Sequence, residues 1–103
     1  MATVYLSLGS NLGEREANIR NALNRLSQFP NIRTQDVSSF YETAPIGYKE
    51  QPDFINIAAR IETDMPPMEL FYVCMKIESE MGRVRNIRWE PRVIDIDLSL
   101  IHI

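Results

Sequence analysis

The chain has 103 residues, of which 45% are hydrophobic and 24% charged, so it is long enough for one domain with a single core. Its net charge of -3 argues against a general nucleic-acid binder, because neutralising phosphates needs a basic surface. No apolar stretch is long enough to span a bilayer, and the single cysteine, Cys74, excludes an internal disulfide, so we expect a cytoplasmic protein. We also expect it to be a monomer.

The first half of the chain predicts a strand, a helix and a second strand. Residues 3–8 alternate apolar and polar side chains, which is typical of a half-buried strand. The glycine-containing segment 9–13 breaks this pattern. Apolar side chains then recur every three or four positions, which predicts a helix over 14–28. We expect the second strand over 32–41 and a long loop over 42–52, where prolines and a glycine occur.

The second half predicts a strand, a helix and a last strand. Residues 54–63 alternate cleanly and predict the third strand. An aspartate and two prolines then mark a helix start, and an apolar stripe that includes Cys74 predicts a buried thiol in a helix that Gly82 ends. An arginine-rich loop is expected over 83–92, and the last strand over 93–100.

This order, β-α-β-β-α-β, predicts an α+β fold of the ferredoxin-like class. We expect an antiparallel sheet of spatial order 4-1-3-2 with both helices on one face. The apolar side chains of every strand then face the helices, and polar or aromatic side chains from distant parts of the sequence share the other face. This set comprises Tyr5, Ser7, Phe54, Asn56, Asp95 and Asp97.

Asp95 and Asp97 are a candidate metal site. They stand at i and i+2 of a predicted strand, on one side and roughly 6.5–7 Å apart along the chain. Carboxylate oxygens are what Mg²⁺ takes from proteins when its other ligands are water and phosphate. The alternative interpretation is a solvated strand face that carries two charges.

The segment 83–92 is rich in arginine and leads directly into this strand. Guanidinium groups bind phosphate oxygens at two points, and Trp89 offers a flat surface for a base or a stacked arginine. With the two aspartates nearby, these residues indicate a magnesium–nucleotide site, although a solvated charged loop is the alternative. The loop 9–13 lacks the lysine of a P-loop, and a tight turn is its favoured role.

Together these segments resemble the hydroxymethyldihydropterin pyrophosphokinase family. Residues 7–13 resemble its opening motif, residues 39–47 its Tyr-x-Thr-x-Pro-x-Gly motif, and residues 51–56 its Gln-Pro-x-[Phe/Tyr]-x-Asn motif. Residues 82–85 are similar to its Gly-Arg-x-Arg motif, and residues 88–97 to its Arg-Trp-Gly-Pro-Arg-x-[Ile/Leu]-Asp-[Ile/Leu]-Asp motif. The resemblance is collinear from Val4 to Leu98.

The resemblance implies a reaction and a substrate pocket. The enzyme would transfer pyrophosphate from ATP to 6-hydroxymethyl-7,8-dihydropterin in folate biosynthesis and release AMP. Phe54 would stack on the pterin ring, while Asn56 and the backbone of Thr43 and Ala44 would bind its polar edge. The implied pocket residues are Thr43, Ala44, Ile46, Phe54 and Asn56.

The resemblance also implies an ATP site. Asp95 and Asp97 would hold two Mg²⁺ ions, and Arg83 and Arg92 would neutralise the transferred phosphates, so these four are the implied catalytic residues. The implied ATP-binding residues are Glu78, Arg83, Arg85, Trp89, Arg92 and Leu98. Loops 47–52 and 83–91 would close over ATP.

Two features depart from the family pattern. Glu90 stands where the family has glycine, and we expect it to face solvent; the alternative is that it pairs with Arg88 and Arg92 and weakens phosphate binding. The family's later histidine- and arginine-containing segment has no counterpart, and we assign no role to His102. Residues 98–103 resemble a translated transposon-end adapter, so we expect 1–103 to be the N-terminal portion of one pyrophosphokinase domain whose native frame ends near residue 98.

The sequence leaves two other classes of function to compare with this one. The first is a catalytically idle ferredoxin-like module that still binds pterin or magnesium–nucleotide. The complete Asp95/Asp97 and Phe54/Asn56 sets favour retained binding, whereas the missing later segment favours lost turnover. The second is an RNA-recognition sheet, which needs exposed aromatic residues on a basic face. Tyr5 and Phe54 beside two aspartates fit that class poorly.

Overall fold

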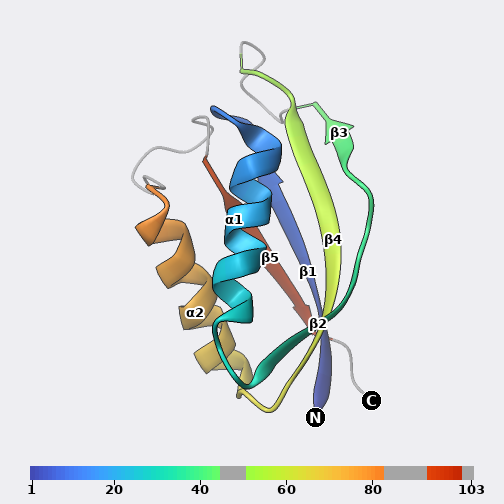
Figure 1. The fold of residues 1–103 in the computed structure, drawn as a ribbon, viewed down its shortest axis with the longest axis vertical. Coiled ribbons are helices and arrows are strands. Elements are labelled where there is room, and N and C mark those ends of the chain that lie inside the picture. Colours follow the sequence, from blue (N-terminus) through green and yellow to red (C-terminus); the bar gives the residue numbers. More distant parts are fainter. Residues whose placement is uncertain (45–50, 83–92, 101–103) are drawn as a thin grey trace.

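The protein is described by a computed structural model that covers residues 1–44, 51–82 and 93–100. The elements, in chain order, are β1 (Ala2–Ser10), α1 (Arg15–Ser27), β2 (Ile32–Val37), β3 (Tyr41–Thr43), β4 (Phe54–Thr63), α2 (Pro67–Glu80) and β5 (Asp95–Leu100). The strands form one antiparallel sheet in the order β2-β4-β1-β5, and β3 pairs with the start of β4. Both helices lie on one face of this sheet (Figure 1), which confirms the predicted ferredoxin-like class.

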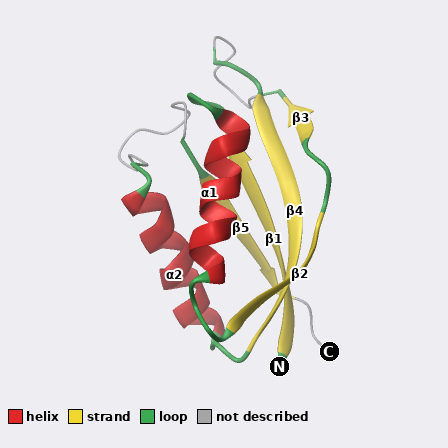
Figure 2. Ribbon diagram, viewed as in Figure 1, coloured by secondary structure: helices red, strands yellow, loops and turns green. Residues whose placement is uncertain are grey.

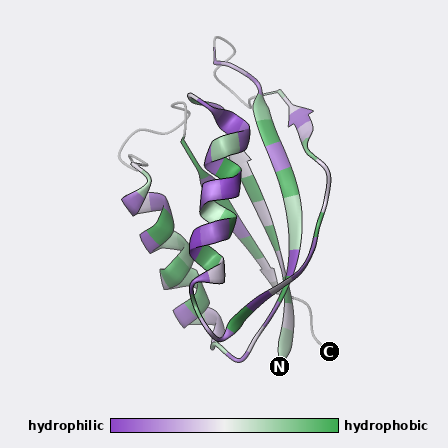
Figure 3. Ribbon diagram, viewed as in Figure 1, coloured by the Kyte–Doolittle hydropathy of each residue, from purple (hydrophilic) through white to green (hydrophobic). Residues whose placement is uncertain are grey.

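The core lies between the helices and the sheet (Figure 2). The side chains of β4 alternate between buried and more exposed, and hydrophilic residues interrupt its hydrophobic ones in Figure 3. Cys74 is buried at 2% exposure, as its helical spacing predicted. The central residues of the core come from both central strands and both helices: Val4, Leu6, Leu8, Ile19, Ala22, Leu26, Ile57, Ile61, Leu70 and Ile77.

The predicted end of the first strand was wrong by two residues. β1 continues through Gly9 and Ser10, which pair with Asn56 and Ile55 of β4. The glycine interrupts the hydrophobic alternation but not the backbone ladder, because pairing needs only the main-chain groups. The turn therefore begins later than its glycine suggested.

The predicted second strand is two strands, β2 and β3. Ser38 ends the first one: its N–H donates to the Ala58 carbonyl, and its hydroxyl accepts the Ala58 N–H, both at 2.8 Å. Phe40 then packs against the core, with the Arg20 guanidinium 5.0 Å from the centre of its ring. β3 consequently starts at Tyr41, inside what was predicted as strand, and includes two residues of the predicted loop.

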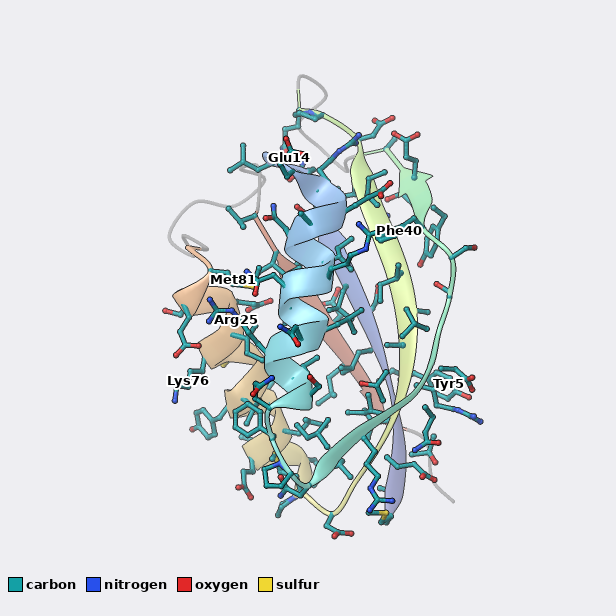
Figure 4. All side chains as sticks on the ribbon, in the orientation of Figure 1. Tyr5, Glu14, Arg25, Phe40, Lys76 and Met81 are labelled. Carbon is teal, nitrogen blue, oxygen red and sulfur yellow. The ribbon has the colours of Figure 1, made fainter. Side chains whose placement is uncertain are left out.

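The two helices match their predicted ranges closely and lie side by side (Figure 1). Arg25 of α1 points toward α2, where it pairs with Glu80 at 3.1 Å, whereas Lys76 points away from the fold (Figure 4). Gly82 follows α2 with a positive φ of 96°, a conformation that suits glycine. Within residues 1–44, 51–82 and 93–100, neither helix has the length and apolar character needed to cross a membrane.

Candidate functional site

One row of residues crosses the helix-free face at one end of the sheet. Asp95 of β5 pairs with Gly9 of β1, Gly9 pairs with Asn56 of β4, and Asn56 pairs with Tyr41 of β3. Residues directly opposite each other in an antiparallel sheet point to the same face. Neighbouring strands lie about 4.8 Å apart, so the backbones of Asp95 and Asn56 are separated by about 10 Å.

A second row runs beside the first. Asp97 pairs with Ser7, and Ser7 pairs with Ala58. Asp97 is exposed and Asp95 half-buried, while Ile96 between them is buried at 8% exposure. Both carboxylates therefore lie on the helix-free face, as the alternation predicted, and the sheet brings them toward the Phe54/Asn56 pair.

The Asn56 side chain is held in a defined direction. Its Nδ2 donates to Thr43 Oγ1 at 2.8 Å and to the Tyr41 carbonyl at 3.5 Å. Both partners belong to β3, the strand that was not predicted separately. β3 thus brings Thr43 beside Asn56, and Phe54 pairs with Thr43 in the same ladder.

Gly9 leaves the room that these side chains occupy. A Cβ atom at this position would lie 2.7 Å from Asn56 Oδ1 and 3.3 Å from Phe54 Cδ1. The first distance is shorter than a carbon–oxygen contact allows, so any side chain here would displace Asn56. The glycine that looked like a turn residue is therefore a spacer between the two halves of the site.

Buried and half-buried polar contacts fix the segment that leads into β4. Asn11 is fully buried, and its Nδ2 donates to Gln51 Oε1 at 2.9 Å and to the Pro52 carbonyl at 3.2 Å. Arg15 adds a hydrogen bond of 2.8 Å from its guanidinium to the Asp53 carbonyl. The end of β1 and the start of α1 thereby hold the residues directly before Phe54.

Asp95 and Asp97 suit a metal that takes most of its ligands from outside the protein. Among residues 1–44, 51–82 and 93–100, no three His, Cys, Asp or Glu side chains gather as a ready-made metal cage. Mg²⁺ in nucleotide sites uses one or two carboxylates, with phosphates and water completing its octahedron. Two carboxylates on the sheet face opposite α1 and α2 fit that pattern better than a dedicated protein cage.

Two residues of the predicted ATP site lie toward the core. Glu78 is buried at 2% exposure in the last turns of α2, and its Oε2 accepts a hydrogen bond of 2.7 Å from the Ile96 N–H. The Leu98 side chain is half-buried and packs against the hydrophobic core. Both residues adjoin the β5 backbone that carries the aspartates.

Several predicted site residues fall outside the described part of the chain. They are Ile46 of the predicted pterin pocket, Arg83, Arg85, Trp89 and Arg92 of the predicted ATP site, Glu90, and most of the two predicted closing loops. Ala44, by contrast, is described, and it is exposed directly after β3.

Sequence reasoning missed the supporting residues of the site. The sequence pattern places Gly9 in a turn and predicts no role for Asn11, Arg15 or Gln51. Periodicity finds apolar faces, so it carries no signal for a buried amide that bonds to another segment. The motifs that contain Asn11 and Gln51 were the available signal, because each places a polar residue next to a strand end.

Comparison with known proteins identifies the family of this chain. The chain matches the model of the 7,8-dihydro-6-hydroxymethylpterin-pyrophosphokinase family over residues 5–103. It is 44% identical over 98 residues to 2-amino-4-hydroxy-6-hydroxymethyldihydropteridine pyrophosphokinase of Bacillus subtilis. The matched region is 95% of this chain and 59% of that relative. The corresponding protein of Haemophilus influenzae is 42% identical over 100 residues, or 97% of this chain and 62% of the relative.

A third relative is longer. The folic acid synthesis protein fol1 of Schizosaccharomyces pombe is 48% identical over 96 residues, which are 93% of this chain and 13% of that protein. The chain spans between 59% and 62% of the length of the two bacterial relatives.

Proposed function

Since the chain belongs to the 7,8-dihydro-6-hydroxymethylpterin-pyrophosphokinase family, we propose that it forms part of an ATP-dependent diphosphokinase of folate biosynthesis. That enzyme transfers the pyrophosphoryl group of ATP to 6-hydroxymethyl-7,8-dihydropterin and releases AMP. The observation that carries the proposal is the Asp95–Gly9–Asn56 row, which brings an acidic residue and a directed amide onto one open sheet face.

The pterin binds at the β3–β4 side of this row. Phe54 stacks on the ring, and Asn56 reads its polar edge together with the backbone of Thr43 and Ala44; Ile46 closes the pocket. The support is the hydrogen bond between Asn56 and Thr43, which fixes the amide before a ligand arrives. A fixed amide loses little conformational freedom on binding.

ATP binds at the β5 side. Asp95 and Asp97 hold Mg²⁺, which when bound screens the charge of the phosphates. Arg83 and Arg92 neutralise the transferred group, and Arg85, Trp89 and the β5 backbone at Leu98 contact the nucleotide, with Glu78 in the same site. The support is that the strand carrying both carboxylates lies next to β1, one strand away from the pterin residues.

The reaction joins the two sides. The hydroxymethyl oxygen of the pterin attacks the β-phosphorus, an O–P bond forms, the bond from that phosphorus to the α-phosphate oxygen breaks, and the hydroxyl proton leaves. Such a transfer depends mainly on positioning and on neutralising charge. The contribution of this chain is to hold the two substrates on one sheet, on strands that flank β1.

The same proposal treats residues 1–103 as part of one domain of a cytoplasmic monomer that binds neither nucleic acid nor membrane. The net charge of -3 and the single cysteine support it.

Formation of AMP from magnesium–ATP, with and without 6-hydroxymethyl-7,8-dihydropterin, tests this function. We expect pterin-dependent AMP, and no ADP, from the 103-residue chain, and a loss of at least about a hundredfold in kcat for Asp97→Asn, as for other groups that stabilise transferring phosphates. Glu62→Gln, at the far end of β4, is the matched control. ADP as the product, or AMP that does not depend on pterin, contradicts the proposal; pterin binding without AMP would assign only the binding step to this chain.

A further inference from the structure

Glu78 is the only acidic side chain buried among the residues that the structure describes. It lies near the end of α2, and its neighbours on the same helical stripe, Cys74 and Ile77, belong to the hydrophobic core. A buried carboxylate is unfavourable unless it is hydrogen-bonded. An apolar side chain would suit this stripe better, so the carboxylate points to a specific task.

That task concerns the backbone of β5. The Ile96 N–H donates to Glu78 Oε2 at 2.7 Å, one of the shorter hydrogen bonds in the described structure. β5 lies at the edge of the sheet, with β1 as its paired strand. The Ile96 N–H points toward α2 and donates to the Glu78 carboxylate. Glu78 therefore supplies the acceptor that a carbonyl group of a neighbouring strand would otherwise supply.

Ile96 lies between Asp95 and Asp97, so its backbone position governs both. The two aspartate side chains extend to the helix-free face from the residues on either side of Ile96, and Asp95 contributes the carbonyl of the held peptide group. A rotation of that peptide would turn the carboxylates apart or away from the row that contains Gly9.

We propose that Glu78 is a positioning residue, which holds the Ile96 N–H so that Asp95 and Asp97 present their carboxylates together to magnesium–nucleotide. This inference rests on the proposed function and deepens it: Glu78 acts through the strand rather than by meeting the nucleotide. The contact needs an acceptor, and a charged acceptor makes the stronger hydrogen bond.

Two variants and one matched control test the role. Glu78→Leu removes the acceptor, and Glu78→Gln keeps a neutral one. Glu80→Gln changes an exposed carboxylate on the same helix turn that pairs with Arg25. Three quantities are measured: amide hydrogen exchange at Ile96 without metal, Mn²⁺ affinity in the presence of a non-hydrolysable ATP analogue, and pterin affinity without nucleotide.

For Glu78→Leu we expect Ile96 exchange to accelerate by about tenfold to a hundredfold, the equivalent of a lost hydrogen bond to a charged group. Mn²⁺ affinity should fall by at least about tenfold, and pterin affinity should stay unchanged, because the pterin residues lie across β1. Glu78→Gln should show smaller losses in the first two quantities, and Glu80→Gln none. If the leucine variant does not fold, the glutamine variant carries the same comparison.

Three outcomes would overturn the role. Unchanged Mn²⁺ affinity despite faster Ile96 exchange would mean that the contact does not position the aspartates. Equal loss of pterin and Mn²⁺ affinity would mean that Glu78 only stabilises the fold. Weaker nucleotide binding with unaltered amide exchange at Ile96 would mean that Glu78 contacts the nucleotide directly. If the unaltered chain binds no Mn²⁺ at all, the proposed function fails and this role with it, so the two failures are distinguishable.

Discussion

Gly9 separates the carboxylate strand from the proposed pterin-binding residues, and the space above it is already filled by the Asn56 side chain. We therefore expect Gly9→Ala to push Asn56 away from Thr43 and weaken pterin binding by at least about tenfold, at an overpacking cost of about 1–3 kcal/mol in stability. Calorimetric titration with pterin measures the first effect and denaturant unfolding the second. Thr3→Val, at the far end of β1, is the control, and pterin affinity equal to that control would refute the spacer role.

Asn11 anchors the segment before Phe54 from inside the fold. Asn11→Ala leaves the buried Gln51 amide without this partner, which costs about 1–3 kcal/mol. We expect pterin affinity to fall together with stability, while Mn²⁺–nucleotide affinity changes less, because β5 is not anchored by this contact. Asn24→Ala, on the exposed side of α1, should alter neither. An Asn11 variant with full pterin affinity would contradict the anchoring role.

Cys74 illustrates how burial suppresses reactivity. Desolvation, and secondarily the negative charge of Glu78, raise the pKa of its thiol from 9.0 to about 12. Because the folded-state pKa exceeds the unfolded value, the protonated thiol contributes to the free energy of unfolding. This contribution is fully present below pH 9 and is lost as the pH rises toward 12. We expect thiol reagents to label the native chain slowly at pH 8 and rapidly after denaturation. Fast labelling of the native chain would contradict this burial.

The residues of the site differ in how well the sequence could predict them. Asp95, Asp97, Phe54 and Asn56 were assigned to one face because strand alternation fixes which side each of them takes. Asn11 was not predicted, because its partner lies forty positions away and an amide contact leaves no periodic trace. Roles that depend on three-dimensional contact between loops thus escape pattern reasoning.

Among the elements, the junction between β4 and α2 depends on one hydroxyl group. Thr63 is buried; its Oγ1 donates to the Asn31 carbonyl at 2.7 Å and accepts the Met65 N–H at 3.0 Å. Thr63→Val keeps the shape but removes both bonds, so we expect a loss of about 1–3 kcal/mol in the free energy of unfolding. Thr34→Val, on the exposed face of β2, should cost less than about 0.5 kcal/mol. Equal stability of the two variants would refute this role.

The elements themselves were largely predictable from the sequence. β4 and both helices follow their patterns because each has one buried face throughout. The first strand runs two residues beyond its predicted end, and the second strand is the larger exception. There, Ser38 exchanges hydrogen bonds with Ala58 through both its backbone and its side chain, and Phe40 packs against the core. No local sequence pattern predicts that the Ser38 hydroxyl accepts the Ala58 N–H in place of a backbone carbonyl.

For the molecule as a whole, the strand order follows from a few rules. Two right-handed β-α-β units leave few arrangements, and the predicted order 4-1-3-2 is the observed one. This order makes β1 central and gathers at one end of the sheet the end of β1 and the starts of β4 and β5 (Figure 1). Segments that are separated by some forty or more positions in sequence, such as those of Gly9, Asn56 and Asp95, therefore meet on adjacent strands.

The claim that this row unites the two substrates can be tested with a paramagnetic ion. Mn²⁺ is added with a non-hydrolysable ATP analogue to the pterin-bound chain, and the relaxation of the bound pterin protons is measured against Mg²⁺ as the diamagnetic control. Because Asp95 and Asn56 are separated by two strand spacings, about 10 Å, we predict strong relaxation enhancement. Replacing both Asp95 and Asp97 by asparagine should abolish it. Pterin that binds tightly but relaxes equally with Mn²⁺ and Mg²⁺ would contradict the shared site.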